Sequence, residues 1–230
     1  MTIRGWKTRY REIRNVFGYR KYDDLISAKK LNSKIGKRYP LSNIKKTIRG
    51  QTVFIIGAGP SLSRSISTLK KYQNITKIVA DGAVQALIEH KIKPQILVTD
   101  LDGDIASIKK IGRTKIPIII HAHGNNYDKL DIVSKLQNKI GTTQTEKFGK
   151  LENFGGFTDG DRCVFLAESF NAKKPTITGY QRVKIRIITT IDNDNVNSTP
   201  CKLSNPASVP SVITNPPGIN DATPIIMDVA

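Results

Sequence analysis

The sequence predicts an α/β protein with a mostly parallel sheet, helices on both faces of the sheet, and an N-terminal helical segment before it. Short, continuous apolar runs such as residues 53–56 recur along the chain. Segments of helical period separate these runs, and glycine or acidic residues directly follow several of them. Strands that are apolar throughout are typical of parallel sheets, because helices cover both of their faces.

The N-terminal segment, residues 1–45, is expected to be helical. Its apolar side chains recur at roughly helical spacing, and Asp23-Asp24 forms a helix-start signal. Gly50 then precedes the first expected strand, residues 52–56. Further strands are expected near residues 75–80, 95–99, 116–121 and 175–179, with helices near 62–72, 83–91, 104–111, 127–139 and 159–170. In a sheet of this kind, ligands bind outside the carboxyl ends of the strands.

Three carboxylates follow the apolar run 96–98 closely, at Asp100, Asp102 and Asp104. Carboxylates this close repel each other unless a metal, a basic partner or water compensates their charge. A further acid, Asp81, follows the apolar run 78–80. We therefore expect Asp81, Asp100 and Asp102 to hold Mg²⁺ at the sheet edge, with Asp100 and Asp102 in catalytic roles. The alternative is a set of turn and helix-cap aspartates, which suits Asp104 best.

A glycine turn between the first strand and the next helix contains Gly57, Gly59 and Ser61. Small residues let the backbone approach a phosphate, and the N-terminus of the following helix offers free N–H groups. The turn is neither a Walker A loop nor a complete GxGxxG, because Ser63 or Arg64 stands in place of the third glycine. A phosphate cradle and a tight turn with Ser61 as N-cap are the two alternatives.

Two histidines, His121 and His123, follow the apolar run 116–120, and strand alternation sends both to the same face. We expect them to contact phosphate or substrate, or to act as acid or base, rather than to bind zinc, because no cysteine lies nearby. A purely structural role is the alternative.

A glycine-rich segment before the last predicted helix leads into Asp159, Asp161 and Arg162. Flexible glycines, a helix N-terminus, two acids and one arginine predict a clamp that closes over a nucleotide or ring. The alternative is helix capping, with Thr158 or Asp159 as N-cap.

The formal net charge of +18 is concentrated in residues 1–45, which carry 13 Lys/Arg and 3 Asp/Glu. This excess indicates a polyanionic partner, or it reflects a general bias toward lysine. No zinc-finger, basic-zipper or RNA-recognition signature accompanies it, so we do not expect nucleic acid as a partner. No apolar run approaches the roughly 18 residues of a membrane helix, and no secretory signal is evident. We therefore expect a cytoplasmic protein without a membrane partner.

The chain is expected to have three regions. These are a basic helical segment (1–48), an α/β nucleotide-binding catalytic core (49–180) and an atypical tail (181–230). The tail holds 6 of the 11 prolines, no glutamate and a single leucine. This composition predicts a loop-rich or disordered segment.

Taken in order, these motifs make the chain resemble the archaeal 6-hydroxymethyl-7,8-dihydropterin diphosphokinase family, which is related to thiamine pyrophosphokinases. The resemblance covers roughly residues 1–180. It is carried by Gly57-Ala58-Gly59-Pro60-Ser61-Leu62, Ala80-Asp81-Gly82-Ala83, Thr99-Asp100-Leu101-Asp102-Gly103, His121-Ala122-His123-Gly124 and residues 153–162. Two features depart from the family pattern. Asn125 stands where an acid is expected, and the sequence after Tyr180 does not continue the family's final strand motif and helix.

The resemblance implies an ATP-dependent diphosphotransferase with Mg²⁺ as cofactor and ATP as co-substrate. Diphosphate would move to the hydroxymethyl group of a reduced pterin alcohol and release AMP, in tetrahydromethanopterin or folate biosynthesis. A homo-oligomer is left open. The alternatives are a thiamine pyrophosphokinase, a sugar-nucleotide-binding protein of the flagellin-modifying type and a basic nucleic-acid-binding module.

Overall fold

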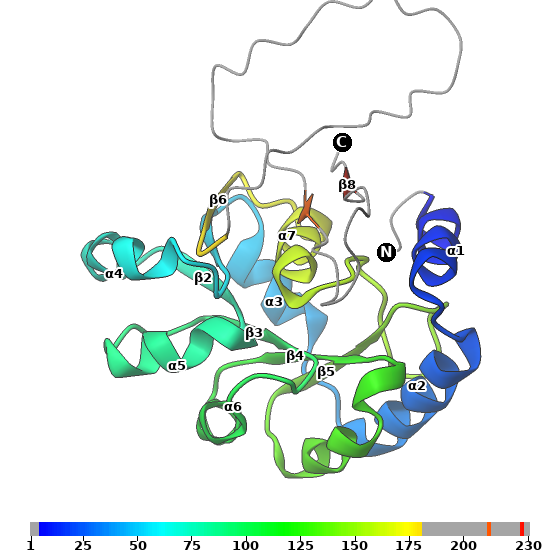
Figure 1. Cartoon of the computed structure of the whole chain (residues 1–230). Coiled ribbons are helices and arrows are strands. Elements are labelled where there is room, and N and C mark those ends of the chain that lie inside the picture. The colour runs from blue at the N-terminus through cyan, green and yellow to red at the C-terminus, as the bar shows by residue number, and fades with distance from the viewer. Residues whose placement is uncertain (1–4, 181–210, 213–225, 228–230) are drawn as a thin grey trace, which may run out of the picture.

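A six-stranded, all-parallel sheet organises the part of the chain that the computed structural model describes, which is residues 5–180, 211–212 and 226–227. The strand order is β5-β4-β3-β2-β1-β6 (Figure 1). The strands are β1 (Thr52–Ile56), β2 (Thr76–Ala80), β3 (Ile96–Thr99), β4 (Ile118–Ala122), β5 (Lys139–Thr143) and β6 (Lys174–Thr178). The predicted fold class is confirmed, and every strand except β5 lies within two residues of its expected position.

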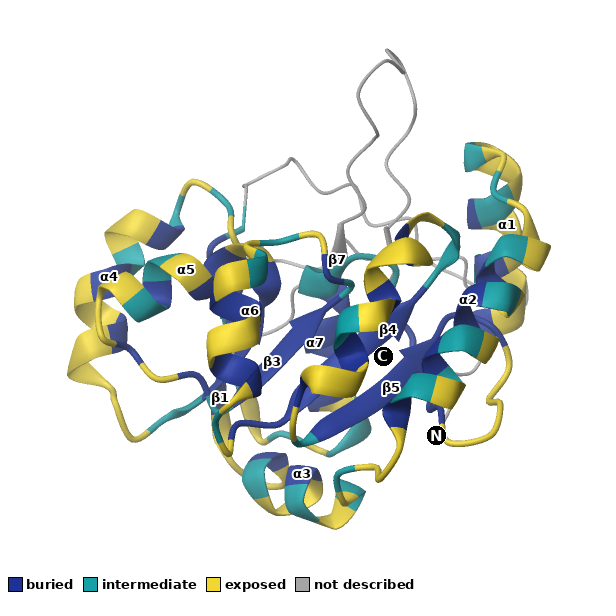
Figure 2. Cartoon of the chain, turned by 90° about the horizontal axis from the view of Figure 1, so that it is seen from below, coloured by how far each residue is buried: buried dark blue, intermediate teal, exposed yellow. Residues whose placement is uncertain are grey.

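Helices cover both faces of this sheet. On one face lie α2 (Lys21–Ile35), α4 (Leu62–Lys71), α5 (Asp81–Glu89) and α6 (Ile105–Gly112), and on the other lie α3 (Leu41–Ile48) and α7 (Asp159–Ser169). The first helix, α1 (Trp6–Phe17), packs through Trp6, Tyr10 and Ile13 against Phe165 of α7. Figure 2 shows the strands buried between these layers, while the outer helix surfaces are exposed.

Strand alternation divides the core into the clusters on the two faces. In β1, Phe54 and Ile56 pack with α4 and α5, whereas Val53 and Ile55 pack with α3 and α7. Burying an aliphatic side chain of this size contributes about 1.5–3 kcal/mol. The apolar side chains on both faces of each inner strand therefore stabilise the fold, which accounts for the unbroken apolar runs in the sequence.

The helix predicted over residues 127–139 is wrong. The structure has two 3₁₀ segments there, η1 (Gly124–Asn126) and η2 (Asp128–Lys135), followed by β5. Buried Leu130, Val133 and Leu136 recur at every third residue, which matches the three residues per turn of a 3₁₀ helix. The strand β5 has one isoleucine but is buried throughout, because α2 covers it and Gly141 lets Ile35 approach.

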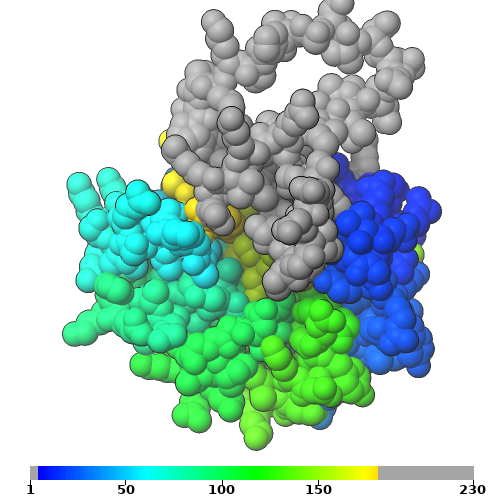
Figure 3. Space-filling model, in the orientation of Figure 1, coloured from blue at the N-terminus to red at the C-terminus, as the bar shows by residue number. Residues whose placement is uncertain are grey.

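The order in which strands are added to the sheet changes direction at β1, although all strands are parallel. Strands β1 to β5 progress toward one edge, and β6 then adds on the other side of β1. Ligands in open α/β sheets bind at the carboxyl edge near such a reversal. Figure 3 shows the N-terminal helices and the α4 segment at opposite sides of the face in view.

Little of the predicted tail is described. β7 (Ser211–Val212) and β8 (Ile226–Met227) pair with each other in a separate antiparallel sheet. The loop-rich or disordered character expected for residues 181–230 otherwise lies outside the described residues. Among the helices that are described, none is both long enough and apolar enough to cross a bilayer.

Candidate active site

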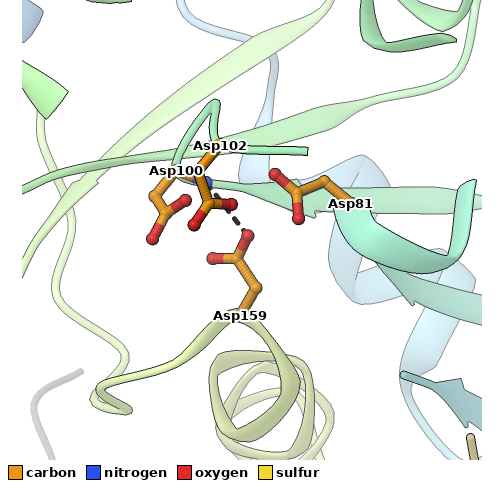
Figure 4. A group of neighbouring side chains, drawn as sticks. All are labelled: Asp81, Asp100, Asp102 and Asp159. Atoms are coloured by element: carbon orange, nitrogen blue, oxygen red, sulfur yellow. Dashed lines mark hydrogen bonds between the residues drawn. The ribbon is translucent and has the colours of Figure 1, made fainter. Parts of the chain in front are cut away.

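Four carboxylates converge at the carboxyl edge of the sheet (Figure 4). Asp81 is the first residue of α5, directly after β2, while Asp100 and Asp102 lie in the loop after β3. Asp159 is the first residue of α7. One oxygen of each carboxylate lies within 4.8 Å of one oxygen of each of the others. The structure thus brings the predicted Mg²⁺ ligands together and adds Asp159, which sequence reasoning had assigned to a nucleotide clamp.

The loop after β3 is built around Asp81. Thr99 Oγ1 donates to Asp81 Oδ2 over 2.7 Å, and Gly103 N donates to the same oxygen over 3.2 Å. Leu101 between them has a φ of 69°, in the left-handed region. A Cβ on Gly103 would lie 2.9 Å from Asp81 Cγ, so only glycine fits this approach. The turn that carries Asp100 and Asp102 is therefore fixed relative to Asp81.

Arg162 and His123 both reach Asp100 in the cluster. Arg162 Nη1 donates to Asp159 Oδ1 over 2.7 Å and to Asp100 Oδ2 over 3.4 Å. His123 Nε2 lies 3.3 Å from Asp100 Oδ2. The second oxygen, Asp100 Oδ1, is buried and has no hydrogen-bond partner among the described residues. An oxygen in this position is suited to bind a cation.

The pKa values in the cluster split in opposite directions. Burial opposes ionisation of Asp100, but the hydrogen bond from His123 and the charge of Arg162 hold its pKa well below the usual range. Partial burial and the neighbouring Asp100 raise the pKa of Asp102 to about 7. Burial and the charge of Asp100 raise the pKa of both Asp159 and Asp81. Without a cation, the four carboxylates cannot all be ionised at low cost.

A cavity of about 260 Å³ opens beside these carboxylates. This is close to the lower end of the ~300–1,000 Å³ typical of small-molecule pockets. One wall carries the acids and the basic groups, and the other comes largely from the N-terminal helices. The lining residues are Tyr19, Arg20, Asp23, Asp24, Asp81, Asp100, Asp102, His123, Gly124, Asn125, Gln144, Phe157, Thr158, Asp159 and Arg162.

The two predicted histidines occupy different environments. His123 lines the cavity, whereas His121 is only 2% exposed and its Nδ1 lies 3.0 Å from Thr142 Oγ1. Burial lowers the pKa of His121 well below its usual value, so this ring is neutral at physiological pH. Asn126 Nδ2 donates to the carbonyls of His121 and Asp100, both over 2.7 Å, and so joins the ends of β4 and β3.

The predicted glycine turn lies at the reversal between β1 and β6. Gly57 N donates to Thr178 O over 2.9 Å, and Gly59 N donates to Gly179 O. Ser61 Oγ donates to Tyr180 O over 3.0 Å and accepts from Gly179 N over 3.1 Å. Among the described residues, the turn contributes nothing to the lining of the carboxylate cavity. It borders α5 instead, because a Cβ on Gly82 would lie 2.9 Å from Ala58 Cβ.

Two of the acidic residues cap helices. Asp104 Oδ2 accepts from Ser107 N over 2.7 Å, as the capping alternative predicted. Asp161 Oδ1 accepts from Thr158 N over 2.6 Å and from Phe157 N over 2.9 Å, in a capping box with Thr158. This geometry favours the capping alternative for Asp161, while Asp159 and Arg162 from the same turn reach the cavity.

Among the cavity-lining residues that the sequence did not predict as site residues are Tyr19, Asp24, Gln144 and Phe157. Asp24 lies in the first turn of α2, as its helix-start signal predicted, but its side chain is also buried at the cavity. Gln144 follows β5, a strand that the sequence did not predict. The polar run at residues 142–145 after an apolar residue was the available signal for a strand end at this edge.

Comparisons with known proteins agree on one family. A model described as 6-hydroxymethylpterin diphosphokinase MptE-like matches residues 28–181. A relative from Methanocaldococcus jannaschii, named 6-hydroxymethyl-7,8-dihydropterin pyrophosphokinase, is 41% identical over 191 residues, covering 78% of this chain and 79% of the relative. A relative of the same name from Pyrococcus furiosus is 41% identical over 179 residues, covering 76% of each chain. A third, from Methanothermobacter thermautotrophicus, is 39% identical over 184 residues, covering 78% of each.

Proposed function

The chain belongs to the 6-hydroxymethylpterin diphosphokinase MptE-like family, and from this premise we propose that it transfers diphosphate from ATP to the hydroxymethyl group of 6-hydroxymethyl-7,8-dihydropterin. The products would be the pterin diphosphate and AMP. The family expected from the order of the motifs is confirmed by these comparisons. The acceptor comes from the names of the relatives, ATP is the donor expected of a diphosphokinase, and the cofactor follows from the carboxylates of the site.

The observation that carries the proposal is the convergence of Asp81, Asp100, Asp102 and Asp159 beside a cavity. An all-carboxylate set is the donor chemistry that suits Mg²⁺, and Asp100 Oδ1 has no partner among the described residues. We therefore assign these four residues as the Mg²⁺ ligands. When bound, the ion supplies positive charge to the ATP phosphate oxygens.

The transfer step moves the β- and γ-phosphates of ATP to the acceptor. The acceptor hydroxyl oxygen forms a bond to the β-phosphorus of ATP, and the bond from that phosphorus to the α–β bridging oxygen breaks, so AMP leaves. The hydroxyl proton passes to water in the cavity. His123 Nδ1 accepts from Asn125 N, so Nε2 carries the hydrogen that faces Asp100 Oδ2, 3.3 Å away, and His123 keeps this carboxylate ionised and in position. Arg162 holds Asp100 and Asp159 in place through its own hydrogen bonds.

The nucleotide is assigned to the β1 side of the cluster. The N–H groups of Gly57 and Gly59 in the predicted cradle already donate to Thr178 O and Gly179 O, so the N-terminus of α4 after Ser61 is the proposed contact for its phosphates. The turn borders the helix that begins with Asp81. The acceptor would then enter from the N-terminal side. The reaction would serve tetrahydromethanopterin or folate biosynthesis.

The test is an incubation of the full chain with Mg²⁺, ATP and one candidate alcohol at a time, with AMP and ADP resolved by chromatography. We expect AMP with 6-hydroxymethyl-7,8-dihydropterin, and none with thiamine or when EDTA replaces Mg²⁺. Formation of ADP would indicate single phosphoryl transfer and contradict the proposal. AMP with thiamine alone would favour the thiamine pyrophosphokinase alternative.

A further inference from the structure

The cavity has a second wall that the transfer step does not use. Its side chains are Tyr19, Asp24, Gln144 and Phe157, from the loop between α1 and α2, from α2, and from the segments after β5 and before α7. We propose, on the basis of the proposed function, that this wall is the acceptor subsite. Asp24, positioned by Gln144, binds the N–H edge of the amino-pyrimidinone ring, and Tyr19 and Phe157 bind its face.

Asp24 is a buried carboxylate held ready in one orientation. It is 3% exposed and lines the cavity. Oδ2 accepts from Tyr10 Oη and from Gln144 Nε2, the latter over 2.9 Å, while Oδ1 accepts from Gly124 N over 2.8 Å. A carboxylate has about four acceptor positions, so one position on Oδ1 is still open to a donor.

Gln144 holds the Asp24 carboxylate from one side. Its amide orientation is fixed, because a carboxylate only accepts hydrogen bonds and Nε2 must therefore face Asp24. Oε1 is buried and faces the buried ring of His121, whose Nε2 is the internal donor available to it. Gln144 thus positions Asp24, and the open acceptor position of this wall is the one on Asp24 Oδ1.

Aromatic rings line the same cavity as Asp24. Tyr19 and Phe157 both line the cavity, and their ring centroids are 6.0 Å apart at an interplanar angle of 28°. Phe17 packs against both rings and supports them from outside the cavity lining, with centroid distances of 5.7 and 6.1 Å. Half-buried, supported rings at a cavity mouth are suited to stack on a flat heteroaromatic ligand.

The Asp24 carboxylate distinguishes between the two reactants, because it only accepts hydrogen bonds. The amino-pyrimidinone edge of a pterin presents its 2-amino group and N3–H side by side, and both groups are donors. Adenine instead presents the N6 amino group next to the N1 acceptor, so N1 would face an oxygen without a hydrogen between them. An unpaired buried acceptor disfavours the wrong ligand strongly. The subsite therefore fits the pterin rather than the base of ATP.

The experiment separates binding from turnover. Binding of the oxidised probe 6-hydroxymethylpterin to the full chain is measured by quenching of pterin fluorescence, and KM is measured for both substrates. We expect Tyr19→Ala to weaken probe binding and raise the acceptor KM about tenfold, with the ATP KM unchanged. Tyr19→Phe keeps the ring and should restore both values. Tyr22→Ala removes an exposed tyrosine of the same helix region and is the matched control.

Asp24→Asn tests the edge contact, because an amide donor would then face donors. We expect at least a tenfold loss of probe binding, with thermal unfolding recorded to identify a folding defect. A folded Tyr19→Ala protein with normal probe affinity, or with a raised ATP KM, overturns the subsite. The proposed function can fail while the subsite stands: in that case the wild-type chain binds the probe but releases no AMP with the reduced pterin.

Discussion

Asp100 and Asp102 are two residues apart, yet they have opposite protonation preferences. Arg162 and His123 face Asp100 and favour its ionised form, whereas Asp102 faces Asp100 and Asp81 and retains its proton up to a pKa of about 7. A cation bound to this cluster therefore displaces protons. Binding of Mg²⁺ should become tighter as pH rises, because metal and proton compete for the same oxygens.

The increase in Tm on adding Mg²⁺, recorded at several pH values, measures this competition between the metal and protons. A carboxyl with a raised folded-state pKa stabilises the fold at low pH, and that contribution is lost as pH rises through the folded pKa. Without Mg²⁺ the cluster should thus lower Tm as pH passes from about 5 to 8. The increase in Tm on adding Mg²⁺ should grow over the same range. Burial lowers the folded-state pKa of His121, so its contribution to stability grows as pH rises toward the usual histidine pKa, and the Mg²⁺-induced difference in Tm is therefore the quantity to compare. A difference that does not change with pH would contradict the metal assignment.

Asp102→Asn should reduce turnover on the order of 10²-fold or more, because it removes one carboxylate from the proposed Mg²⁺ site beside the transferred phosphates. Asp102 is exposed, so we expect the fold to be retained, and Tm without Mg²⁺ to be unchanged or slightly higher as repulsion is relieved. Asp104→Asn is the matched control, since asparagine caps α6 as well as aspartate does. Steady-state AMP formation and thermal unfolding distinguish the two. Asp100→Asn should lose activity similarly, but it also leaves Arg162 less well paired.

At the level of elements, the N-terminus of α7 combines a cap and a site. Thr158 Oγ1 accepts from Asp161 N in the first turn, and the Asp161 carboxylate accepts from Thr158 N and Phe157 N just before the helix. The same turn points Asp159 and Arg162 toward the carboxylates. In the sequence Thr-Asp-Gly-Asp-Arg, each of the two acids could be either a helix cap or a residue of the site. Only the backbone geometry decides that Asp161 turns back toward Phe157 N, whereas Asp159 points forward.

Asp161→Ala should destabilise the protein by about 1–2 kcal/mol, because the N–H groups of Phe157 and Thr158 lose their acceptor. We expect a lower Tm and lower turnover but an unchanged ATP KM. Asp161→Asn keeps an acceptor oxygen and should lose less stability. An ATP KM raised tenfold in a folded Asp161→Ala protein would instead support the nucleotide clamp predicted from sequence.

The elements show where sequence patterns suffice. Strands β1 to β4 are apolar runs with clear boundaries, and the acids after β2 and β3 could be placed at one edge from the sequence alone. Strand β5 could not, because Lys139, Thr142 and Thr143 are polar and become buried only through α2 and through pairing with β4. Missing β5 also concealed Gln144. Asp24 was concealed for a similar reason, since its partners Tyr10, Gly124 and Gln144 are remote in sequence.

Across the whole molecule, the strand order explains how remote motifs meet. Adjacent strands β2 and β3 bring Asp81 beside Asp100, and α7 crosses the opposite face to present Asp159 from below the same edge. The N-terminal helices close the cavity because α1 is anchored on Phe165 and α2 on β4 and β5. This closure depends on tertiary packing and could not be predicted from helical periodicity.

The last strand of the parallel sheet, β6, defines how far the chain must extend for this assembly. It pairs with β1 along its length, Thr178 at its end accepts from Gly57 N, and Gly179 and Tyr180 beyond it bond to Gly59 and Ser61. Tyr180 Oη also donates to Gly160 O over 2.8 Å in α7. The family match ends at residue 181, directly after these contacts. The described contacts thus indicate a functional boundary just past Tyr180.

A chain truncated after residue 184 should therefore keep its Tm and its rate of AMP formation. Truncation after residue 173 removes β6 and the contacts that hold the glycine turn, so we expect aggregation or a large loss of Tm. The two truncations differ by a single strand, and thermal unfolding with an AMP assay compares them directly. The prediction for the longer chain could fail through β7, which lies next to α7. A lower Tm after truncation at 184, with activity lost in parallel, would show that residues beyond 184 contribute to the packing of α7 and hence to the position of Asp159.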